Sequence, residues 1–247
     1  MKKLNVGLVG AGFMGKAHSI GYSDMPKYFW PAPAVPVLKT ICDIVPEIAA
    51  DAKERFGFEK CCTDWRDIVN DPEIDVVSIC TPNNVHAEIA IAALNAGKHV
   101  LCEKPIASTL EDAKAMAEAM NAYQYRRVPA IDLAKKFIDE GSIGKILNVR
   151  CTYLQSWSAD PASPLSWRFQ KDIAGAGTLG DIASHVIDIA QYLAGDIEAV
   201  TGMMQTYITE RPVQESGTDL LGTVKLGADA KRKAVDVDDE DSFLVKF

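Results

Sequence analysis

The sequence has few of the features that would assign it to a membrane, secreted or nucleic-acid-binding class. Its 247 residues contain no apolar run of the length that crosses a bilayer. Lys2 and Lys3 precede an apolar stretch, but glycines interrupt that stretch after a few residues, so we expect no signal peptide. The net charge is -8 and no basic run offsets it, which argues against a nucleic-acid or anionic-membrane partner.

Paired cysteines and metal-binding motifs are also missing. None of the 6 cysteines belongs to a C-x-x-C motif, and Cys42, Cys80 and Cys102 lie in strand-like runs, where free cysteine behaves as a small hydrophobic residue. The acidic run 235–241 lacks the glycine and the terminal glutamate of a calcium loop, so we expect no metal. These absences predict a reduced, cytoplasmic protein, long enough for two modest domains or one large one.

A glycine-rich turn near the N-terminus is the feature around which we interpret the rest. Residues 4–8 form a nearly continuous apolar run, typical of a buried parallel strand, and residues 13–22 have a helical pattern. Between them, three glycines at G-x-G-x-x-G spacing permit a tight turn, close approach of a pyrophosphate and close packing of helix on strand. Such turns also occur for purely structural reasons, but this context favours dinucleotide binding. The residues expected to hold the dinucleotide there are Gly10, Gly12, Phe13, Met14 and Gly15.

The second predicted strand, 37–42, ends at Asp43, where a dinucleotide fold bonds the adenosine ribose. Asp43 lies further beyond Gly15 than usual, and an aromatic- and proline-rich excursion at 28–36 accounts for the excess. A carboxylate there repels a ribose 2′-phosphate, so NAD is favoured over NADP as cofactor. The alternative is that Asp43 caps the predicted helix 46–56.

Two further strand ends carry polar side chains. The apolar runs 76–80 and 99–102 predict buried parallel strands, and cofactors lie at the carboxyl ends of such strands. We interpret His86 as the start of a helix, 86–96, rather than as a catalyst, because no acidic residue adjoins it. Lys104 is either a solvated charge or a functional group that faces the nicotinamide. The residues expected to border the cofactor at these two ends are Thr81, Pro82, Asn83, His86, Glu103 and Lys104.

The pattern changes in the second half of the chain. A helix predicted at 109–120 leaves no room for the next parallel strand, so we expect that strand to be absent or a segment to be missing after Met120. An amphipathic helix is predicted at 129–140, and the alternating pattern of 146–154 predicts a strand of a different, half-exposed sheet. The domain division is therefore expected at 1–122 and 123–247.

Further strands are predicted near the end of the chain. We expect one at 198–209 and another that begins at 243, with a polar loop at 211–233 between them. The chain stops inside the second of these strands. Because an abandoned sheet edge promotes aggregation, we expect a segment to be missing after Phe247 as well.

A second chemical centre is predicted at the glycine-rich stretch 175–180 and the helix that follows. Asp181 and His185 stand at i, i+4 and share a face, which we expect to point away from the apolar stripe of the helix. A histidine beside a carboxylate is suited to general-base catalysis near neutral pH, although a satisfied histidine on a polar face is the alternative. Trp167 and Arg168 lie in a preceding loop and suit either a sugar or domain packing.

Taken together, these motifs resemble the Gfo/Idh/MocA family of glucose–fructose oxidoreductase and inositol dehydrogenase. The glycine turn, Thr81-Pro82-Asn83, Glu103-Lys104-Pro105, Arg127-Val-Pro129 and the Asp181/His185 helix occur in that order. The resemblance implies an α/β protein with an N-terminal doubly wound parallel Rossmann sheet. It further implies a C-terminal α/β domain with a mainly antiparallel open sheet, incomplete in this chain, that often forms a homo-oligomer interface. It also allows a cis peptide bond before Pro105.

The family resemblance also implies roles for individual residues. Lys104, Asp181 and His185 would be the catalytic group: His185 takes the hydroxyl proton, Lys104 polarises the oxygen, and Asp181 orients the substrate or tunes His185. Tyr123, Arg127, Trp167 and Arg168 would contact a sugar or polyol. The expected activity is NAD-dependent oxidation of a secondary alcohol in a dimer or tetramer. A non-catalytic NAD or sugar sensor and an NAD-dependent glycoside hydrolase are the alternatives.

Overall fold

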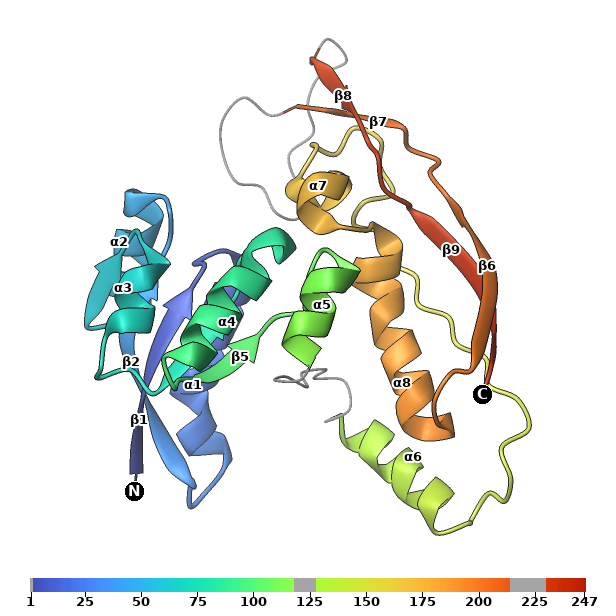
Figure 1. Ribbon diagram of the computed structural model, residues 1–247, viewed down its shortest axis with the longest axis horizontal. Helices are drawn as coiled ribbons and strands as arrows, with labels where there is room; N and C mark the ends of the chain where they lie inside the picture. Colours follow the sequence, from blue (N-terminus) through green and yellow to red (C-terminus); the bar gives the residue numbers. More distant parts are fainter. Residues whose placement is uncertain (1, 118–127, 214–229) are drawn as a thin grey trace. The chain divides into compact units, whose positions relative to one another are not determined.

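The computed structural model describes residues 2–117, 128–213 and 230–247. It divides into two compact units, residues 1–122 and 123–247, and each is described by itself (Figure 1). No helix within the described ranges is both long enough and apolar enough to span a membrane.

The first unit is built on a five-stranded parallel sheet with the order β3-β2-β1-β4-β5. The strands are β1 (Lys2–Val9), β2 (Ala34–Cys42), β3 (Lys60–Cys62), β4 (Val76–Ile79) and β5 (His99–Cys102). The helices are α1 (Phe13–Tyr28), α2 (Pro46–Phe56), α3 (Trp65–Asn70), α4 (His86–Asn95) and α5 (Leu110–Ala117), with a short helix η1 (Asn83–Val85). The strand order reverses between β1 and β4, and ligands of doubly wound sheets bind at that point.

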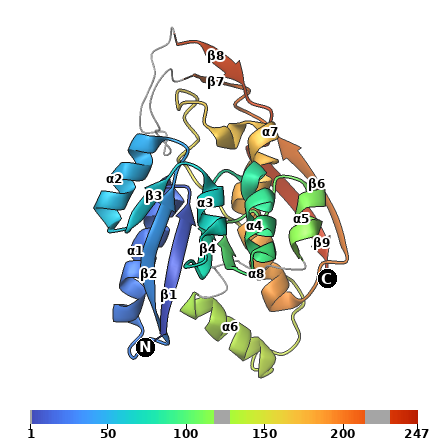
Figure 2. The ribbon, with the colours of Figure 1, turned by 60° about the vertical axis from the view of Figure 1, so that its left-hand side comes forward.

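Apolar side chains on the two faces of this sheet explain why its strands form continuous hydrophobic runs. One cluster packs Leu8 and Ile41 against Ala52 of α2, and the other packs Val77 and Ile79 against α3 and α4. Helices α1 and α2 therefore cover one face, and α3 and α4 the other (Figure 2). The predicted Rossmann architecture is confirmed.

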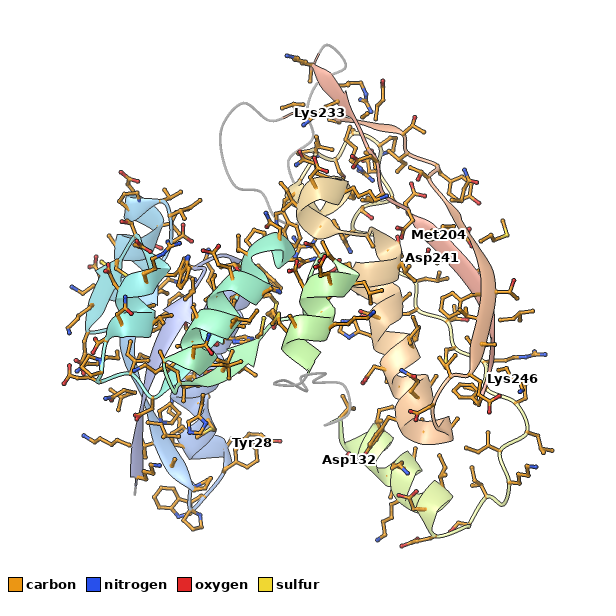
Figure 3. All side chains as sticks on the ribbon, in the orientation of Figure 1. Tyr28, Asp132, Met204, Lys233, Asp241 and Lys246 are labelled. Carbon is orange, nitrogen blue, oxygen red and sulfur yellow. The ribbon has the colours of Figure 1, made fainter. Side chains whose placement is uncertain are left out.

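The connection between α1 and β2 differs from the prediction. Helix α1 continues to Tyr28 and β2 begins at Ala34, so the excursion expected at 28–36 is reduced to the residues between these two elements. Pro26 lies in the last turn of α1 and has no N–H to donate to a helix carbonyl, and the helix ends two residues later at Tyr28. Tyr28 is 84% exposed and projects away from the end of the helix (Figure 3). Strand β3 was not predicted, because three residues are too short for a pattern.

The second unit contains helices and two small antiparallel sheets. Its helical elements are α6 (Pro129–Asp139), η3 (Trp167–Phe169), α7 (Lys171–Ala174), η4 (Leu179–Ala183) and α8 (Ser184–Ala194). Its strands are β6 (Ala199–Gln205), β7 (Glu210–Pro212), β8 (Arg232–Ala234) and β9 (Glu240–Lys246). Strand β6 pairs with β9, and β7 pairs with β8. The antiparallel character expected of this half is confirmed.

Two predictions for the second unit were wrong. Residues 146–154 form no strand, because they are largely exposed and pair with no other strand in the described part of the chain. The polar loop expected at 211–233 includes residues of β7 and β8, while 214–229 lie outside the described residues. Arg211 of β7 is buried and attaches this strand to the preceding loop. Its guanidinium lies 4.1 Å from the centre of the Phe169 ring and donates to the carbonyls of Ser158 and Asp160.

Candidate active site

The predicted glycine turn connects β1 to α1 and requires glycine at two positions. Gly10 has φ 97, and a Cβ there would lie 2.7 Å from the carbonyl oxygen of Cys80. A Cβ at Gly15 would lie 2.0 Å from the carbonyl oxygen of Gly10. Both contacts are shorter than van der Waals distance, so a side chain at either position would displace the turn from the strand.

The start of α1 is suited to an anion. Its N-cap is Gly12, no side chain caps the helix, and its first turn contains no acidic residue. No acidic side chain of the helix's own first turn therefore neutralises the positive end of the helix dipole. A pyrophosphate fits these backbone N–H groups, including those of Phe13 and Met14.

Asp43 follows β2 and reaches back to the glycine turn. Its Oδ2 accepts from the Ala11 N–H at 3.0 Å, and its Oδ1 accepts from the Val45 N–H at 3.0 Å. The carboxylate is thereby fixed at the carboxyl edge of the sheet, beside the turn. Val45 is the N-cap residue of α2, so the bond from Val45 is the one that a role of Asp43 in starting this helix explains. The bond from Ala11 is not explained by that alternative, because Ala11 belongs to the glycine turn.

The loops that follow β4 and β5 are joined by His86, which is fully buried at the first position of α4. Its Nδ1 lies 3.0 Å from the carbonyl oxygen of Pro105, and its Nε2 lies 2.9 Å from that of Thr81. Burial lowers the pKa of His86. Both ring nitrogens face the protein, so direct contact between this imidazole and a cofactor stays a prediction. Asn83, in η1 of the same loop, is 6% exposed.

Lys104 lies just beyond β5, half-buried, and the peptide bond to Pro105 is cis. The preceding Glu103 accepts from His18 Nε2 at 2.9 Å and from the Lys104 backbone N–H at 3.2 Å. Burial raises the pKa of Glu103, but the His18 bond and the nearby positive charges outweigh it, so the pKa lies below its ordinary value. Because His18 belongs to α1, the bond to His18 directs the carboxylate of Glu103 toward that helix. This bond to His18 was not predicted, because the partners are far apart in sequence.

Asp181 and His185 lie at the junction of η4 and α8. Residues Leu179–Ala183 form a π-helical turn rather than the α-helix we expected, and such turns are common at functional sites. Asp181 Oδ2 lies 3.7 Å from Arg168 Nε, and the Arg168 guanidinium stacks on Trp167 at 4.5 Å. The loop and helix residues predicted from sequence are thus brought together through Arg168.

The environment of His185 differs from the prediction. We expected a polar helix face, but His185 is 4% exposed and Asp188 is 5% exposed. Of the apolar stripe expected on this helix, Ile182 is 8% exposed, and the other members are half-buried: Leu179, Val186, Ile189 and Leu193. The Tyr153 ring lies 6.1 Å from the imidazole, so the segment predicted to be a strand packs against this face instead. Tyr123 and Arg127, the other predicted substrate contacts, lie outside the described residues.

A residue of the acidic run 235–241 fixes the backbone of the glycine-rich stretch that leads into η4. Asp238 accepts from the Gly177 N–H at 2.9 Å and from the Leu179 N–H at 2.7 Å. A Cβ at Gly177 would lie 1.9 Å from the carbonyl oxygen of Asp238, so glycine is required for this close approach. The sequence pointed to Gly177 but gave no sign of its partner, because 61 residues separate the two.

A cavity of about 450 Å³ in the second unit receives several of these polar groups. Its lining includes Tyr153, Trp157, Arg168, Asp181 and Asp241. Burial and the neighbouring Asp238 raise the pKa of Asp241 to about 7. Aromatic and hydrogen-bonding side chains around one space are suited to a small polar molecule.

The parallel sheet and the glycine turn place the chain in the class of Rossmann-fold proteins that bind NAD. Comparison with known families agrees. Residues 4–128 match the oxidoreductase family with an NAD-binding Rossmann fold, and residues 131–247 match the GFO/IDH/MocA C-terminal domain. The chain belongs to the Gfo/Idh/MocA family.

Within this family, the chain is similar to several sugar and polyol dehydrogenases. The chain is 59% identical to levoglucosan dehydrogenase of Pseudarthrobacter phenanthrenivorans over 255 aligned residues, which cover 100% of this chain and 65% of that protein. It is 28% identical to myo-inositol 2-dehydrogenase of Thermotoga maritima, over 78% of this chain and 55% of that protein. A levoglucosan dehydrogenase structure with NADH and levoglucosan has a TM-score of 0.90 at 56% identity, covering 100% of this chain and 64% of that chain. The chain thus matches between 55% and 65% of the length of these relatives.

Proposed function

We propose that this protein is an NAD-dependent dehydrogenase that oxidises a secondary hydroxyl of a sugar. The observation that carries the proposal is that one chain combines the glycine turn and Lys104 with Asp181 and His185, in a sequence 59% identical to a levoglucosan dehydrogenase. We propose an anhydro sugar such as levoglucosan as the first substrate to test. Free sugars and cyclic polyols, which include inositols, are the next candidates.

In this proposal the first unit holds the cofactor. The pyrophosphate lies on the N-terminus of α1, and the ribose hydroxyls bond to Asp43. The carboxylate of Asp43 disfavours a 2′-phosphate, which supports NAD over NADP. When bound, NAD supplies the acceptor for the hydride that leaves the substrate carbon.

The protein's own groups handle the proton and the oxygen. His185 takes the proton from the hydroxyl group, since a general base must act on the oxygen from which the proton leaves. Lys104 donates a hydrogen bond to that oxygen, which stabilises the negative charge that develops on it. Asp181, paired with Arg168, orients a neighbouring hydroxyl. Trp167 and Arg168 offer a flat, polar surface to the sugar ring.

A coupled pair of measurements tests this proposal. Purified protein is mixed with NAD and with levoglucosan, glucose or myo-inositol, and NADH formation is followed by absorbance. We expect turnover with levoglucosan, and we expect His185→Ala to lower kcat by about 10²- to 10⁴-fold while NADH affinity changes by less than about threefold. Retention of turnover by His185→Ala would exclude its role as the base.

The alternatives give different results in the same assay. A sensor would bind NADH and sugar without turnover in the unmodified protein. A glycoside hydrolase that uses NAD transiently would release products from a glycoside with no net NADH. Substitution of Lys104 by Met separates these further, because only a dehydrogenase would lose NADH production from a free alcohol.

We also propose a homo-oligomer formed through the β6–β9 sheet. Met203 on β6 and Leu244 on β9 are each more than 60% exposed and lie on the same face of the sheet, because Leu244 stands opposite Thr201, two residues before Met203. Apolar side chains in such a group favour contact with another protein surface. Light scattering on the purified protein would give the mass, and Met203→Glu with Leu244→Glu should shift it to the monomer.

A further inference from the structure

The short turn that carries Lys104 is held from both sides by imidazoles. Glu103, which precedes the lysine, is bonded by His18 from α1, and Pro105, which follows it, lies against His86 from α4. All of these residues belong to the first unit. The structure therefore ties the backbone on each side of Lys104 to a different helix of the dinucleotide domain.

His18 is placed to join three elements. Its Nε2 donates to Glu103 Oε1 at 2.9 Å, and its Nδ1 lies 2.9 Å from Ser78 Oγ, which is fully buried in β4. The other Glu103 oxygen accepts from the Lys104 backbone N–H. Glu103 is thus a link between the His18 ring and the lysine backbone, since its side chain bonds both.

His86 plays a matching part on the other side. Its Nδ1 faces the Pro105 carbonyl, and its Nε2 faces the Thr81 carbonyl in the loop after β4. Nδ1 therefore contacts the turn that contains Lys104, and Nε2 contacts the loop after β4, which is expected to border the cofactor.

We infer that His18 and His86 are positioning residues that fix Lys104 for the reaction, through Glu103 on one side and Pro105 on the other. Neither imidazole needs to touch the substrate for this role. The inference rests on the proposed function, in which Lys104 bonds the substrate oxygen. A misplacement of about 1 Å in a catalytic group costs on the order of 100-fold in rate, so loosening either contact should be visible in kcat.

Asparagine and glutamine distinguish the two ring nitrogens at position 18. The amide nitrogen of Gln reaches the place of Nε2, whereas that of Asn reaches the place of Nδ1. His18→Gln should keep the donor to Glu103, while His18→Asn should keep only the contact with Ser78. We expect kcat of His18→Asn to fall about 10- to 100-fold below that of His18→Gln, with the Kd for NADH alike in both.

At position 86 the order is reversed. His86→Asn should keep the contact with Pro105 and lose that with Thr81, whereas His86→Gln should do the opposite. We expect His86→Gln to have the lower kcat and His86→Asn the weaker NADH binding. The exposed His99, at the start of the strand that precedes Glu103, supplies the control, since His99→Asn and His99→Gln should behave alike.

Thermal unfolding of each variant separates loss of folding from loss of positioning, because the comparison uses only variant pairs of equal Tm. If a pair differs in Tm, the double variant with Glu103→Ala replaces it: with the acceptor side chain absent, His18→Asn and His18→Gln should have equal kcat. Equal kcat for both substitutions at position 18, or the same order at both positions, would overturn the inference. If Lys104→Met keeps full turnover, it is the proposed role of Lys104 that fails.

Discussion

The two units build their ligand-facing turns in different ways. In the first, the Gly10–Gly15 turn depends on missing side chains: Gly15 packs on the Gly10 carbonyl, and the helix start has no cap. In the second, the approach to η4 depends on an added side chain, since Asp238 accepts from both the Gly177 and Leu179 N–H groups. At the glycine turn no side chain caps the start of α1, while at η4 a carboxylate bonds the backbone N–H groups.

This difference explains why the start of α1 is suited to an anion and the start of η4 is not. An anion needs N–H groups and a helix dipole that no protein carboxylate neutralises. At η4 the carboxylate of Asp238 occupies that position, so the chemistry of the second unit must come from side chains such as Asp181 and His185. Adding a side chain to the glycine turn should therefore weaken NADH binding, whereas removing the Asp238 side chain from the η4 turn should lower the free energy of unfolding.

The largest effect is expected from Gly15→Ala. The new methyl group would meet the Gly10 carbonyl at 2.0 Å and push α1 away from the turn. NADH affinity should fall at least about 100-fold, measured by fluorescence titration. Gly21→Ala, in the same helix with nothing within 4 Å, is the matched control. It should leave NADH affinity unchanged and raise stability by about 0.5–1 kcal/mol, and binding by Gly15→Ala within threefold of the original would contradict the steric argument.

The next effect is expected from Asp238→Ala, which removes the acceptor of two backbone N–H groups. Hydrogen bonds to a charged group contribute about 1.5–3 kcal/mol each, so the free energy of unfolding should fall by about 3 kcal/mol, measured with urea. NADH affinity should stay the same, because the clamp lies in the other unit. Asp236→Ala removes only one exposed bond, to the Lys171 N–H, and should cost about 1 kcal/mol or less. Equal losses for the two variants would refute the clamp.

The same comparison shows which parts were predictable from sequence. The turn between β1 and α1 and the ends of β2, β4 and β5 were located correctly because a strand, a turn and a helix follow one another within a few residues. The Asp238 clamp and the β7–β8 pair connect segments far apart in the chain, and no local pattern records such contacts. The strand predicted at 146–154 failed for the same reason, since alternation indicates a strand but not whether a partner is present.

A smaller effect is expected from Asp43→Asn, which keeps the shape of the side chain but removes its charge. The Kd for NADH should rise about tenfold, equivalent to about 1.4 kcal/mol, because the ribose loses a charged acceptor. The preference for NADH over NADPH should narrow, since a 2′-phosphate no longer meets a carboxylate. Parallel titrations with both nucleotides measure this, and an unchanged ratio of the two Kd values would show that Asp43 does not read the ribose.

The smallest effect is expected from Asp241→Asn. The pKa of Asp241 in the folded protein is about 7, above its ordinary value of 3.8, so folding favours the protonated form. This stabilisation is complete below pH 3.8 and is lost as the pH rises through 7, where a partly buried carboxylate faces Asp238.

After allowance for solvent screening, asparagine should stabilise the protein by about 1 kcal/mol at pH 8, a rise in Tm of about 2–4 °C, and by less at pH 5. Asp239→Asn is the control, because Asp239 accepts from the Tyr207 and Ile208 N–H groups, and its loss should lower Tm at both pH values. A Tm of Asp241→Asn that does not depend on pH relative to the original protein would mean that the carboxyl group is hydrated rather than buried against Asp238.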